Sequence, residues 1–433
     1  MRSRSRRRTS ACSPRRRTRP RECAPSWTSV RRGSRDGERL CGERELAMTR
    51  EVARVVLGSL SLRDFRNLAR LDLGFPSAGA VVVGENGQGK SNLLEAIYYL
   101  HLLRSVRGAR DVDVVRFGAP GFHISARTSG GAYHELSAGF ERQGRRKRVK
   151  LDGSEPPRLS DGLGALPCVL FSPADVDLVA GAPSSRRRYL DILLALSSRP
   201  YLAALQRYRA ALAQRNAALR ESLRGSAARA EQRVAVWEAP LAEHGAVLWR
   251  ERVLWSDRAA GRFSELCAAI GEQAPVAMRY ATPLEPSSTE TNDIAEALAR
   301  ALEHRRGLDL RRGITHAGPH RDDLALTLDA RELRAFGSAG QQRTAAIALR
   351  LLEAETLHDR LGAAPLFLLD DPFAELDARR SSRILELLAD QGMGQTLLTV
   401  PRESDIPTAL SSLARWRIAA GVVTHDDAHA GAA

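Results

Sequence analysis

One stretch of this sequence constrains its fold more than any other: residues 84–91 read Gly-Glu-Asn-Gly-Gln-Gly-Lys-Ser. The pattern G-x-x-x-x-G-K-S forms a phosphate loop when it joins a buried strand to a helix. Here the apolar run 80–83 precedes the motif, and 92–103 carries leucine and isoleucine at helical spacing. The sequence therefore predicts an α/β domain that binds a nucleoside triphosphate.

The chemistry of the motif explains its residue types. Gly84, Gly87 and Gly89 let the backbone turn tightly and direct N–H groups at phosphate oxygens, and the helix that follows adds a positive end. Lys90 is expected to bridge the β- and γ-phosphates, and the hydroxyl of Ser91 to ligate Mg²⁺. Only 3 of the 66 basic residues are lysines, so a lysine here indicates a need for a compact ammonium group. The predicted nucleotide-binding residues of this segment are Gly84, Glu85, Asn86, Gly87, Gln88, Gly89, Lys90, Ser91 and Asn92.

A second motif supplies the acidic side of the same site. The apolar run 366–369 ends in Asp370 and Asp371, as in a Walker B strand whose carboxyl edge lies beside the phosphate loop. Asp370 is expected to hold Mg²⁺ through water. Asp371 stands where ABC-type ATPases usually carry the glutamate that polarises the attacking water. The predicted catalytic residues are thus Lys90 and Asp371, and the shorter aspartate predicts slow turnover.

Two further segments resemble parts of ABC-type ATPases. Ser338, Gly340 and Gln341 open a helix shortly before the Walker B strand and resemble the signature S-G-G-Q, while 374–377 match the D-loop that follows Walker B. The resemblance implies a head-to-tail dimer. In it, the helix that begins at Ser338 would cap the γ-phosphate held by Lys90 of a second copy.

The order of patterns along the chain predicts an α/β fold: an ABC-type P-loop ATPase head with a mixed sheet, plus an inserted helical lobe. Short strands dominate up to residue 151, and helices rich in Leu, Ala and Arg fill 184–270, broken near Gly225 and Pro240. A polar linker then precedes a helix at about 293–306, and strand, turn and strand patterns return near 313–328. We therefore divide the chain into 48–183 (first part of the ATPase domain), 184–306 (helical lobe) and 307–433 (second part, ending in a flexible tail).

The first 47 residues differ from the rest. They hold 15 arginines and 5 acidic residues, which is ten of the fifteen net positive charges, and they lack the apolar core of a signal peptide. Three interpretations are open: a disordered basic arm that grips nucleic acid, a transit-like segment, or sequence upstream of a true start at Met48. We favour the last, because strand patterns begin directly after it. Three of the five cysteines fall in this segment, and the others are isolated, which fits a reducing cytoplasm. No run of 18 apolar residues predicts a membrane span.

The spacing of the motifs narrows the class of ATPase. Ser338 follows Ser91 by 247 positions, which is too far for a compact transporter subunit and too near for the long coiled-coil arms of chromosome-maintenance proteins. Across about 52–405 the chain closely resembles the RecF family of bacterial recombination mediators. The segments that carry the resemblance are 60–68, 84–98, 171–179, 186–191, 318–324, 340–344 and 369–371.

The resemblance implies a cytoplasmic, nucleoid-associated protein with slow, DNA-stimulated ATPase activity. Members of the family dimerise on ATP and bind double-stranded DNA at gaps. They act with RecR and RecO to load RecA. By the same resemblance Arg66 and Asn67 would line the nucleotide, whereas 103–107 departs from the family pattern and leaves the role of Arg107 open. A transport ATPase serving a membrane partner is the competing interpretation.

Three other clusters admit both a functional and a structural interpretation. The basic run 145–150 is the best sequence-level candidate for DNA phosphate contacts, although an exposed hairpin with solvated charges fits nearly as well. Residues 186–188 read as one helix face of ion pairs. His316 lies near the acids at 322 and 323, but we expect a turn in which Asp322 or Asp323 pairs with an arginine rather than a metal site.

Overall fold

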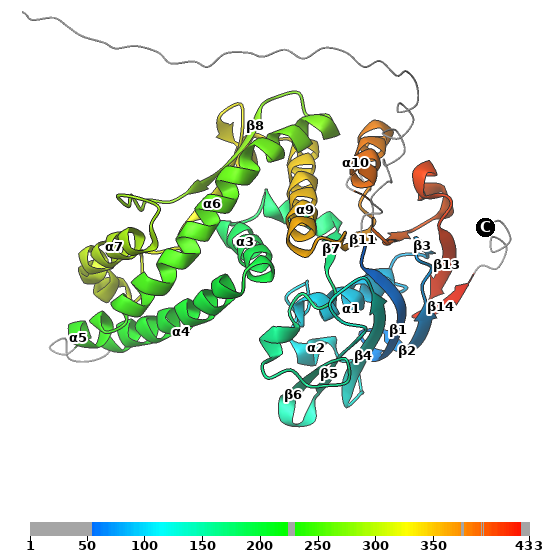
Figure 1. Ribbon diagram of the computed structural model, residues 1–433, viewed down its shortest axis with the longest axis horizontal. Helices are drawn as coiled ribbons and strands as arrows, with labels where there is room; N and C mark the ends of the chain where they lie inside the picture. Colours follow the sequence, from blue (N-terminus) through cyan, green and yellow to red (C-terminus); the bar gives the residue numbers. More distant parts are fainter. Residues whose placement is uncertain (1–53, 224–229, 374–375, 391, 393, 426–433) are drawn as a thin grey trace, which may run out of the picture. The chain divides into compact units, whose positions relative to one another are not determined.

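The computed structural model describes residues 54–223, 230–373, 376–390, 392 and 394–425, which belong to one compact unit, 52–433. The segment 1–47 and the predicted tail from 426 lie outside the described residues, as do Ala374 and Glu375 of the predicted D-loop. Three sheets and the helices around them make up the described part (Figure 1).

A six-stranded mixed sheet forms the centre of the ATPase part. Its neighbours are parallel except for the terminal antiparallel pair β13–β14. In spatial order the strands are β14 (Val422–His425), β13 (Ala414–Ala419), β3 (Gly79–Val83), β12 (Thr396–Val400), β11 (Leu366–Asp370) and β7 (Cys168–Phe171). Both faces of β3 are buried, since Ala80 and Val82 join one apolar core while Val81 and Val83 join the other. The predicted buried strand before the phosphate loop is thereby confirmed.

A five-stranded antiparallel sheet packs on the apolar core that contains Ala80 and Val82. In spatial order it contains β2 (Leu68–Gly74), β1 (Val56–Phe65), β4 (Gly121–Ser129), β5 (Glu135–Glu141) and β6 (Arg146–Leu151). Along β1 and β4 the apolar residues alternate with polar ones, so one face packs inward and the other faces solvent. The helix after the phosphate loop, α1 (Lys90–Leu102), contributes to the same core, and the short α2 (Asp111–Val114) follows it.

Helices dominate 183–312, as the sequence predicts. They are α3 (Pro183–Ser197), α4 (Arg199–Ser222), α5 (Ala230–Ala235), α6 (Glu238–Ile270) and α7 (Thr291–Arg312). The long helices α4 and α6 lie close together near α5 and diverge from there in Figure 1, and they contact each other. The predicted break near Pro240 is confirmed: it falls just before α6, and Pro240 lies in the first turn of that helix, where a backbone N–H has no partner within the helix. One expectation needs correction, because helix α7 continues past residue 306 to Arg312.

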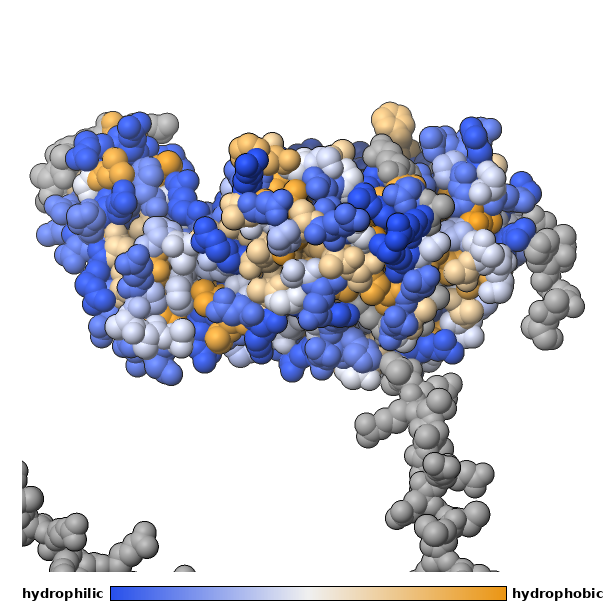
Figure 2. Space-filling model, turned by 90° about the horizontal axis from the view of Figure 1, so that it is seen from above, coloured by the Kyte–Doolittle hydropathy of each residue, from blue (hydrophilic) through white to orange (hydrophobic). Residues whose placement is uncertain are grey.

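A third, three-stranded sheet belongs to this region and was only partly expected. Its order is β10 (Arg331–Glu332), β9 (Asp323–Leu328) and β8 (Val276–Ala281). The sequence pattern placed two strands near 313–328, but only β9 lies there, and its partner β8 comes from before α7. The remaining helices are α8 (Leu333–Phe336), α9 (Ala339–Leu361) and α10 (Ala378–Asp390). The face drawn in Figure 2 is mostly hydrophilic, with apolar residues in small groups.

Candidate nucleotide site

The phosphate loop occupies the connection between β3 and α1, as predicted. Gly87 and Gly89 have φ values of 83° and 116°, which non-glycine residues rarely adopt. A Cβ atom at Gly89 would also lie 2.9 Å from the side-chain nitrogen of Asn67, and one at Gly84 would lie 2.5 Å from the carbonyl oxygen of Ile418. The three glycines are therefore required by backbone conformation and by close packing around the loop.

Lys90 is the first residue of α1, and its ammonium group lies inside the loop. The group donates hydrogen bonds to the carbonyl oxygens of Gly84 and, at 3.0 Å, Glu85. Only 6% of the residue is exposed, and burial lowers the pKa of Lys90, while Asp370 and Asp371 act in the opposite direction. The ammonium group of Lys90 is thus held inside the loop that would bind the phosphates of a nucleoside triphosphate.

Ser91 and the Walker B strand meet at one oxygen atom. The hydroxyl groups of Ser91 and of Thr399, at the end of β12, each donate to Oδ1 of Asp370 at 2.8 Å. These are hard oxygen ligands of the kind that Mg²⁺ prefers, so the donor set fits that ion. From the sequence alone, Thr399 is only a loose match to the switch position of transporters.

Asp371 lies directly beyond β11 in an unusual backbone conformation. Its φ is 47°, and its N–H donates to the carbonyl oxygen of Thr399 at 3.0 Å. Burial raises the pKa of Asp371 above its ordinary value, and the neighbouring Asp370 and Asp405 raise it further. A constrained carboxylate beside a phosphate loop is suited to accept a hydrogen bond from water.

These residues surround a cavity of about 410 Å³. Its lining includes eight predicted site residues: Asn86, Gly87, Gly89, Lys90, Ser91, Asn92, Asp370 and Asp371. Arg107 and Pro173 also line it and were not predicted to do so. Arg107 donates to the side-chain oxygen of Asn92 at 3.1 Å, which gives a place to the residue whose role the sequence left open.

Other predicted residues support the loop instead of lining the cavity. The side chain of Asn67 donates to the carbonyl oxygen of Gln88 at 3.2 Å and accepts from Asn92 at 2.8 Å. Gln88 also accepts, through its backbone oxygen, from Gly421 at 2.9 Å and, through its side chain, from Ala420 at 2.6 Å. The loop is therefore held from outside by the β1–β2 and β13–β14 turns.

Arg66 has a buried partner. Its guanidinium binds both carboxylate oxygens of Glu95 at 2.9 and 3.1 Å, and Glu95 also accepts from Ser105 at 2.5 Å. The ion pair holds Arg66 beside α1, and Arg66 is not among the residues that line the cavity. Glu95 also pairs with Arg107 of the cavity lining at 3.7 Å.

The signature segment lies at the start of α9, away from this cavity. Ser338 caps the helix, accepting from the backbone N–H of Gln341 at 3.3 Å, and the N–H of Ser338 donates in return to the Gln341 side chain at 2.9 Å. Ser338 is exposed and is not part of the cavity lining, and neither are Gly340 and Gln341. One copy of the chain thus carries the two halves of the expected composite site in separate places.

The geometry of the site has counterparts among known proteins. Residues 56–415 match the family described as RecF/RecN/SMC N terminal domain. A protein named DNA replication and repair protein RecF, from Salinibacter ruber, is 35% identical over 83% of this chain and 88% of its own length. Its counterpart in Anaeromyxobacter dehalogenans is 38% identical over 84% of this chain and 98% of its own length. The chain belongs to the RecF family.

A solved structure agrees with this family. It describes the recombination mediator protein RecF-ATPrS in the RecFOR pathway, and it is 29% identical with a TM-score of 0.79. The match covers 87% of this chain and 99% of that one. A second structure, of RecF-ATP, has a TM-score of 0.78 at 28% identity. None of these RecF-family matches supports the transporter alternative, and none of the described helices is both long and apolar enough to span a bilayer.

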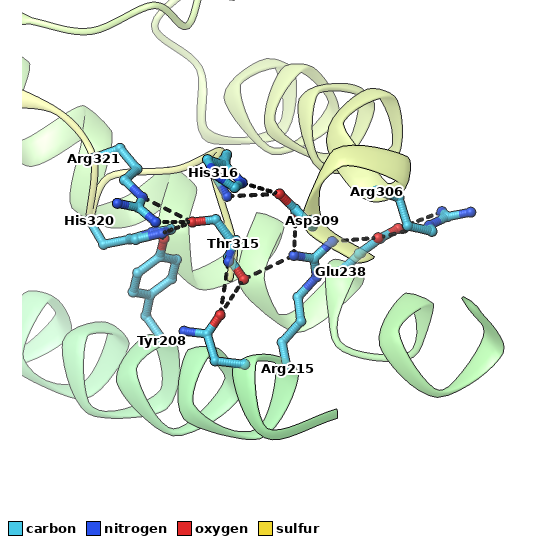
Figure 3. Close-up of polar contacts among 10 residues, drawn as sticks. Tyr208, Arg215, Glu238, Arg306, Asp309, Thr315, His316, His320 and Arg321 are labelled. Carbon is cyan, nitrogen blue, oxygen red and sulfur yellow. Dashed lines mark hydrogen bonds and ion pairs between the residues drawn. The ribbon is translucent and has the colours of Figure 1, made fainter. Parts of the chain in front are cut away.

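The histidines near residue 316 belong to a buried polar network in this member of the RecF family (Figure 3). The fully buried Arg215 donates to Asp309 at 2.7 Å and to Thr315 at 2.9 Å. His316 is hydrogen-bonded to Asp309 at 2.7 Å, and His320 to the carbonyl oxygen of Thr315 at 3.1 Å. Among the described residues no group of three or more His, Cys, Asp or Glu is placed to hold a metal ion. The hydrogen bonds of the network join α4 to α7 and to the segment that follows α7.

The acidic pair after this loop behaves as predicted. Asp323 forms a two-point ion pair with Arg186 of α3, with both distances 2.8 Å. Arg187 donates to the backbone oxygen of Asp322 at 2.8 Å. The expectation of a turn in which Asp322 or Asp323 pairs with an arginine is confirmed. At least two of the three arginines at 186–188 therefore form polar contacts that stabilise the fold.

The basic run 145–150 divides into two faces. Lys147 turns inward, where it forms an ion pair with Asp111 at 2.7 Å and donates to the carbonyl oxygen of Leu103, also at 2.7 Å. Its alternate neighbours Arg146, Arg148 and Lys150 are exposed on the other face of β6. Lys147 is therefore a structural residue of this sheet.

Proposed function

We propose that this chain is an ATP-switched, DNA-binding ATPase that acts in DNA replication and recombinational repair. The relatives named DNA replication and repair protein RecF and the RecF-ATP structure support this assignment. Within the proposal, the protein binds double-stranded and gapped DNA without sequence specificity. It acts in the cytoplasm, at the nucleoid, with RecO and RecR as partners.

The observation that carries the proposal is the separation of the two half-sites. The cavity holds Lys90, Ser91 and Asp370, whereas the signature residue Ser338 is exposed elsewhere on the chain. A helix N-terminus stabilises an anion only at short range. ATP in one copy would therefore recruit the signature helix of a second copy, and the nucleotide would join two subunits.

Within that dimer we assign a role in ATP hydrolysis to the polar residues of the cavity. The ammonium of Lys90 neutralises phosphate charge that develops as the terminal bond breaks. Ser91 and Asp370 would hold Mg²⁺, which would supply electrostatic stabilisation of the phosphates. The carboxylate of Asp371 orients the attacking water, and its short side chain leads us to expect slow hydrolysis. Slow hydrolysis suits a switch, because the DNA-bound dimer then persists between turnovers.

The experiment is sedimentation of the full chain with ATP, with ADP and without nucleotide, each repeated with a gapped duplex. We expect a dimer only with ATP and DNA binding that follows the dimer. A dimer of equal affinity in all three states would contradict the switch.

A further inference from the structure

The solvent face of the five-stranded sheet carries a line of basic side chains across its strands. Arg63 of β1 is in register with Arg70 of β2 on one side and with His123 of β4 on the other. His123 is in register with Gly139 of β5, and Gly139 with Arg148 of β6. We call Arg70, Arg63, His123 and Arg148 the cation row. Because neighbouring strands are about 4.8 Å apart, the row crosses the sheet within about 19 Å.

A second row lies beside the first and consists mainly of small hydroxyl residues. Asp72, Ser61, Ser125, Ser137 and Lys150 are successive register partners on β2, β1, β4, β5 and β6. We call these five the serine row. Their short side chains leave a surface hollow of about 630 Å³, whose lining also includes His123 of the cation row. Besides the serines, the lining contains the basic side chains of His123, Arg127 and Lys150 and the carboxylates of Asp72 and Glu135. Ser61 donates its hydroxyl to Asp72, so Ser125 and Ser137 are the hydroxyl donors that the serine row offers to the hollow.

The positive charge of this face is only partly neutralised by the protein: Arg70 pairs with Asp72 at 3.2 Å, and Arg127 pairs with Glu135 at 3.2 Å. Arg63, Arg148 and Lys150 are exposed, and in the described part of the chain none of them forms an ion pair. Like charges on directly opposite residues destabilise a sheet, and Arg63 stands opposite Arg70. Burial lowers the pKa of His123, and the nearby Arg63 and Lys150 lower it further. An external anion would relieve this repulsion.

We propose that the cation row and the serine row form the surface on which the phosphate backbone of duplex DNA lies. This inference rests on the DNA binding proposed above and assigns it a site. Arginine and lysine contribute the charge that displaces counterions from DNA, and serine hydroxyls donate to phosphate oxygens. A row of cations matches a polyphosphate better than a single bound ion, because the charges are spread over a width of about 19 Å.

The same strand links this face to the nucleotide site. Arg63 lies four residues before Asn67, whose side chain holds the phosphate loop at the backbone oxygen of Gln88. A DNA phosphate bound at Arg63 would therefore contact the strand that leads directly to Asn67 and the phosphate loop. The basic run seen in the sequence covers only part of this surface, since β6 contributes Arg148 and Lys150 while Lys147 points inward.

The test compares two triple variants of the full chain with equal loss of charge. The first carries Arg63→Gln, Arg148→Gln and Lys150→Gln. The control carries Arg300→Gln, Arg311→Gln and Arg312→Gln, exposed positions on α7. Affinity for a fluorescent gapped duplex is measured by anisotropy with ATP over a series of salt concentrations. The first variant should bind at least about tenfold more weakly, and its salt slope should be shallower by about 0.9 for each phosphate that the protein no longer neutralises.

Further measurements keep the outcome decisive. ATP-dependent dimerisation should be normal in both triple variants, and Arg63→Lys with Arg148→Lys should bind DNA nearly as well as the unchanged chain. If the triple variant does not dimerise, Arg148→Gln alone, on the edge strand, replaces it. Equal affinity and equal salt slope in the variant and the control would overturn the site while leaving DNA binding intact. An unchanged chain that binds polyglutamate but no DNA would refute the DNA assignment itself and indicate an acidic protein partner.

Discussion

The two halves of the ATP site differ in how completely one chain builds them. The phosphate-loop half is preorganised: Lys90 is buried, Ser91 and Thr399 are both bonded to Asp370, and two turns hold the loop from outside. The signature half is a capped helix end at the surface, and the hydrogen bonds that Ser338 forms with other described residues lie within its own turn.

This difference separates binding from assembly. A preformed pocket can take up a nucleotide at little conformational cost, because its side chains are already in place. An exposed helix end contributes nothing until a second copy supplies a phosphate. Substitutions in the first half should therefore affect nucleotide binding and hydrolysis, and those in the second half should affect association alone.

The largest effect is expected from Lys90→Ala. Removal of the buried ammonium should lower ATP hydrolysis by about 10²–10³-fold, since it removes the cation that is hydrogen-bonded inside the phosphate loop. Steady-state phosphate release measures the loss, and ATP titration measures the accompanying loss of affinity. Hydrolysis at the unchanged rate would show that the phosphate-loop half of the site does not depend on Lys90.

Ser338→Arg should abolish the ATP-dependent dimer while each monomer still binds ATP. In the head-to-tail arrangement the long arginine side chain would fill the space that the γ-phosphate of the other copy takes at the helix N-terminus, and overpacking of this kind costs about 1–3 kcal/mol, or roughly 10- to 100-fold in affinity. Sedimentation with ATP measures the affinity of the dimer. Ser287→Arg, on the exposed linker before α7, is the matched control.

A mixture sharpens the same test. Combining Ser338→Arg with Lys90→Ala subunits restores one of the two composite sites, so partial recovery of the dimer is expected. A Ser338→Arg homodimer of normal affinity would rule out the head-to-tail arrangement.

Asp371→Asn should slow hydrolysis by about 10²-fold and trap the dimer with ATP bound. Asparagine tolerates the left-handed backbone found at this position, so the change removes the carboxylate without adding strain. Asp329→Asn, at an exposed turn with a φ of 48°, is the control.

The pH profile gives an independent check on Asp371. Because its pKa is raised, the carboxylate is lost as the pH falls through a value above the ordinary range of aspartate. The rate of the unchanged chain should show this acid limb, and the residual rate of Asp371→Asn should not. An acid limb that survives the substitution would assign it to another group.

The smallest effect is expected from Thr399→Val. The substitution removes one of the two hydroxyl bonds to Asp370 and preserves the shape of a fully buried residue. A single hydrogen bond contributes about 1 kcal/mol, so hydrolysis should fall by only about fivefold. Titration with Mg²⁺ at saturating ATP measures whether the loss lies in metal affinity. A collapse as large as that of Lys90→Ala would show that the Mg²⁺ side of the pocket is less preorganised than its hydrogen bonds indicate.

The sequence predicts the parts of this site that are encoded by contiguous residues. The phosphate loop, the Asp370–Asp371 end of β11 and the cap at Ser338 depend on short-range spacing, and each occurs where it was expected. Contacts between distant segments could not be predicted in this way. The bond from Ala420 to Gln88 joins residues 332 positions apart, and nothing local in either segment specifies it.

The same limit applies to the sheets. The sequence did not predict that β8, which precedes helix α7 in the chain, pairs with β9, which follows it. The pattern of a strand gives no information about which strand it pairs with. The inward direction of Lys147 could have been inferred, because Lys147 shares one face of β6 with the buried apolar residues Val149 and Leu151. Its partners Asp111 and Leu103 lie in distant segments, and the sequence does not identify them.

The position of β3 in the central sheet has a consequence for biosynthesis. Its two neighbours, β12 and β13, lie more than 300 residues later in the chain, and the turn that secures Gln88 follows β13. A chain emerging from the ribosome therefore carries an apolar, unpaired strand and an unsupported phosphate loop until these late segments have been made. Non-local pairing of this kind slows folding and exposes the unfinished chain to aggregation. Nascent or prematurely terminated chains should consequently be unable to bind ATP, so that only a polypeptide extending through β14 can enter the dimerisation cycle.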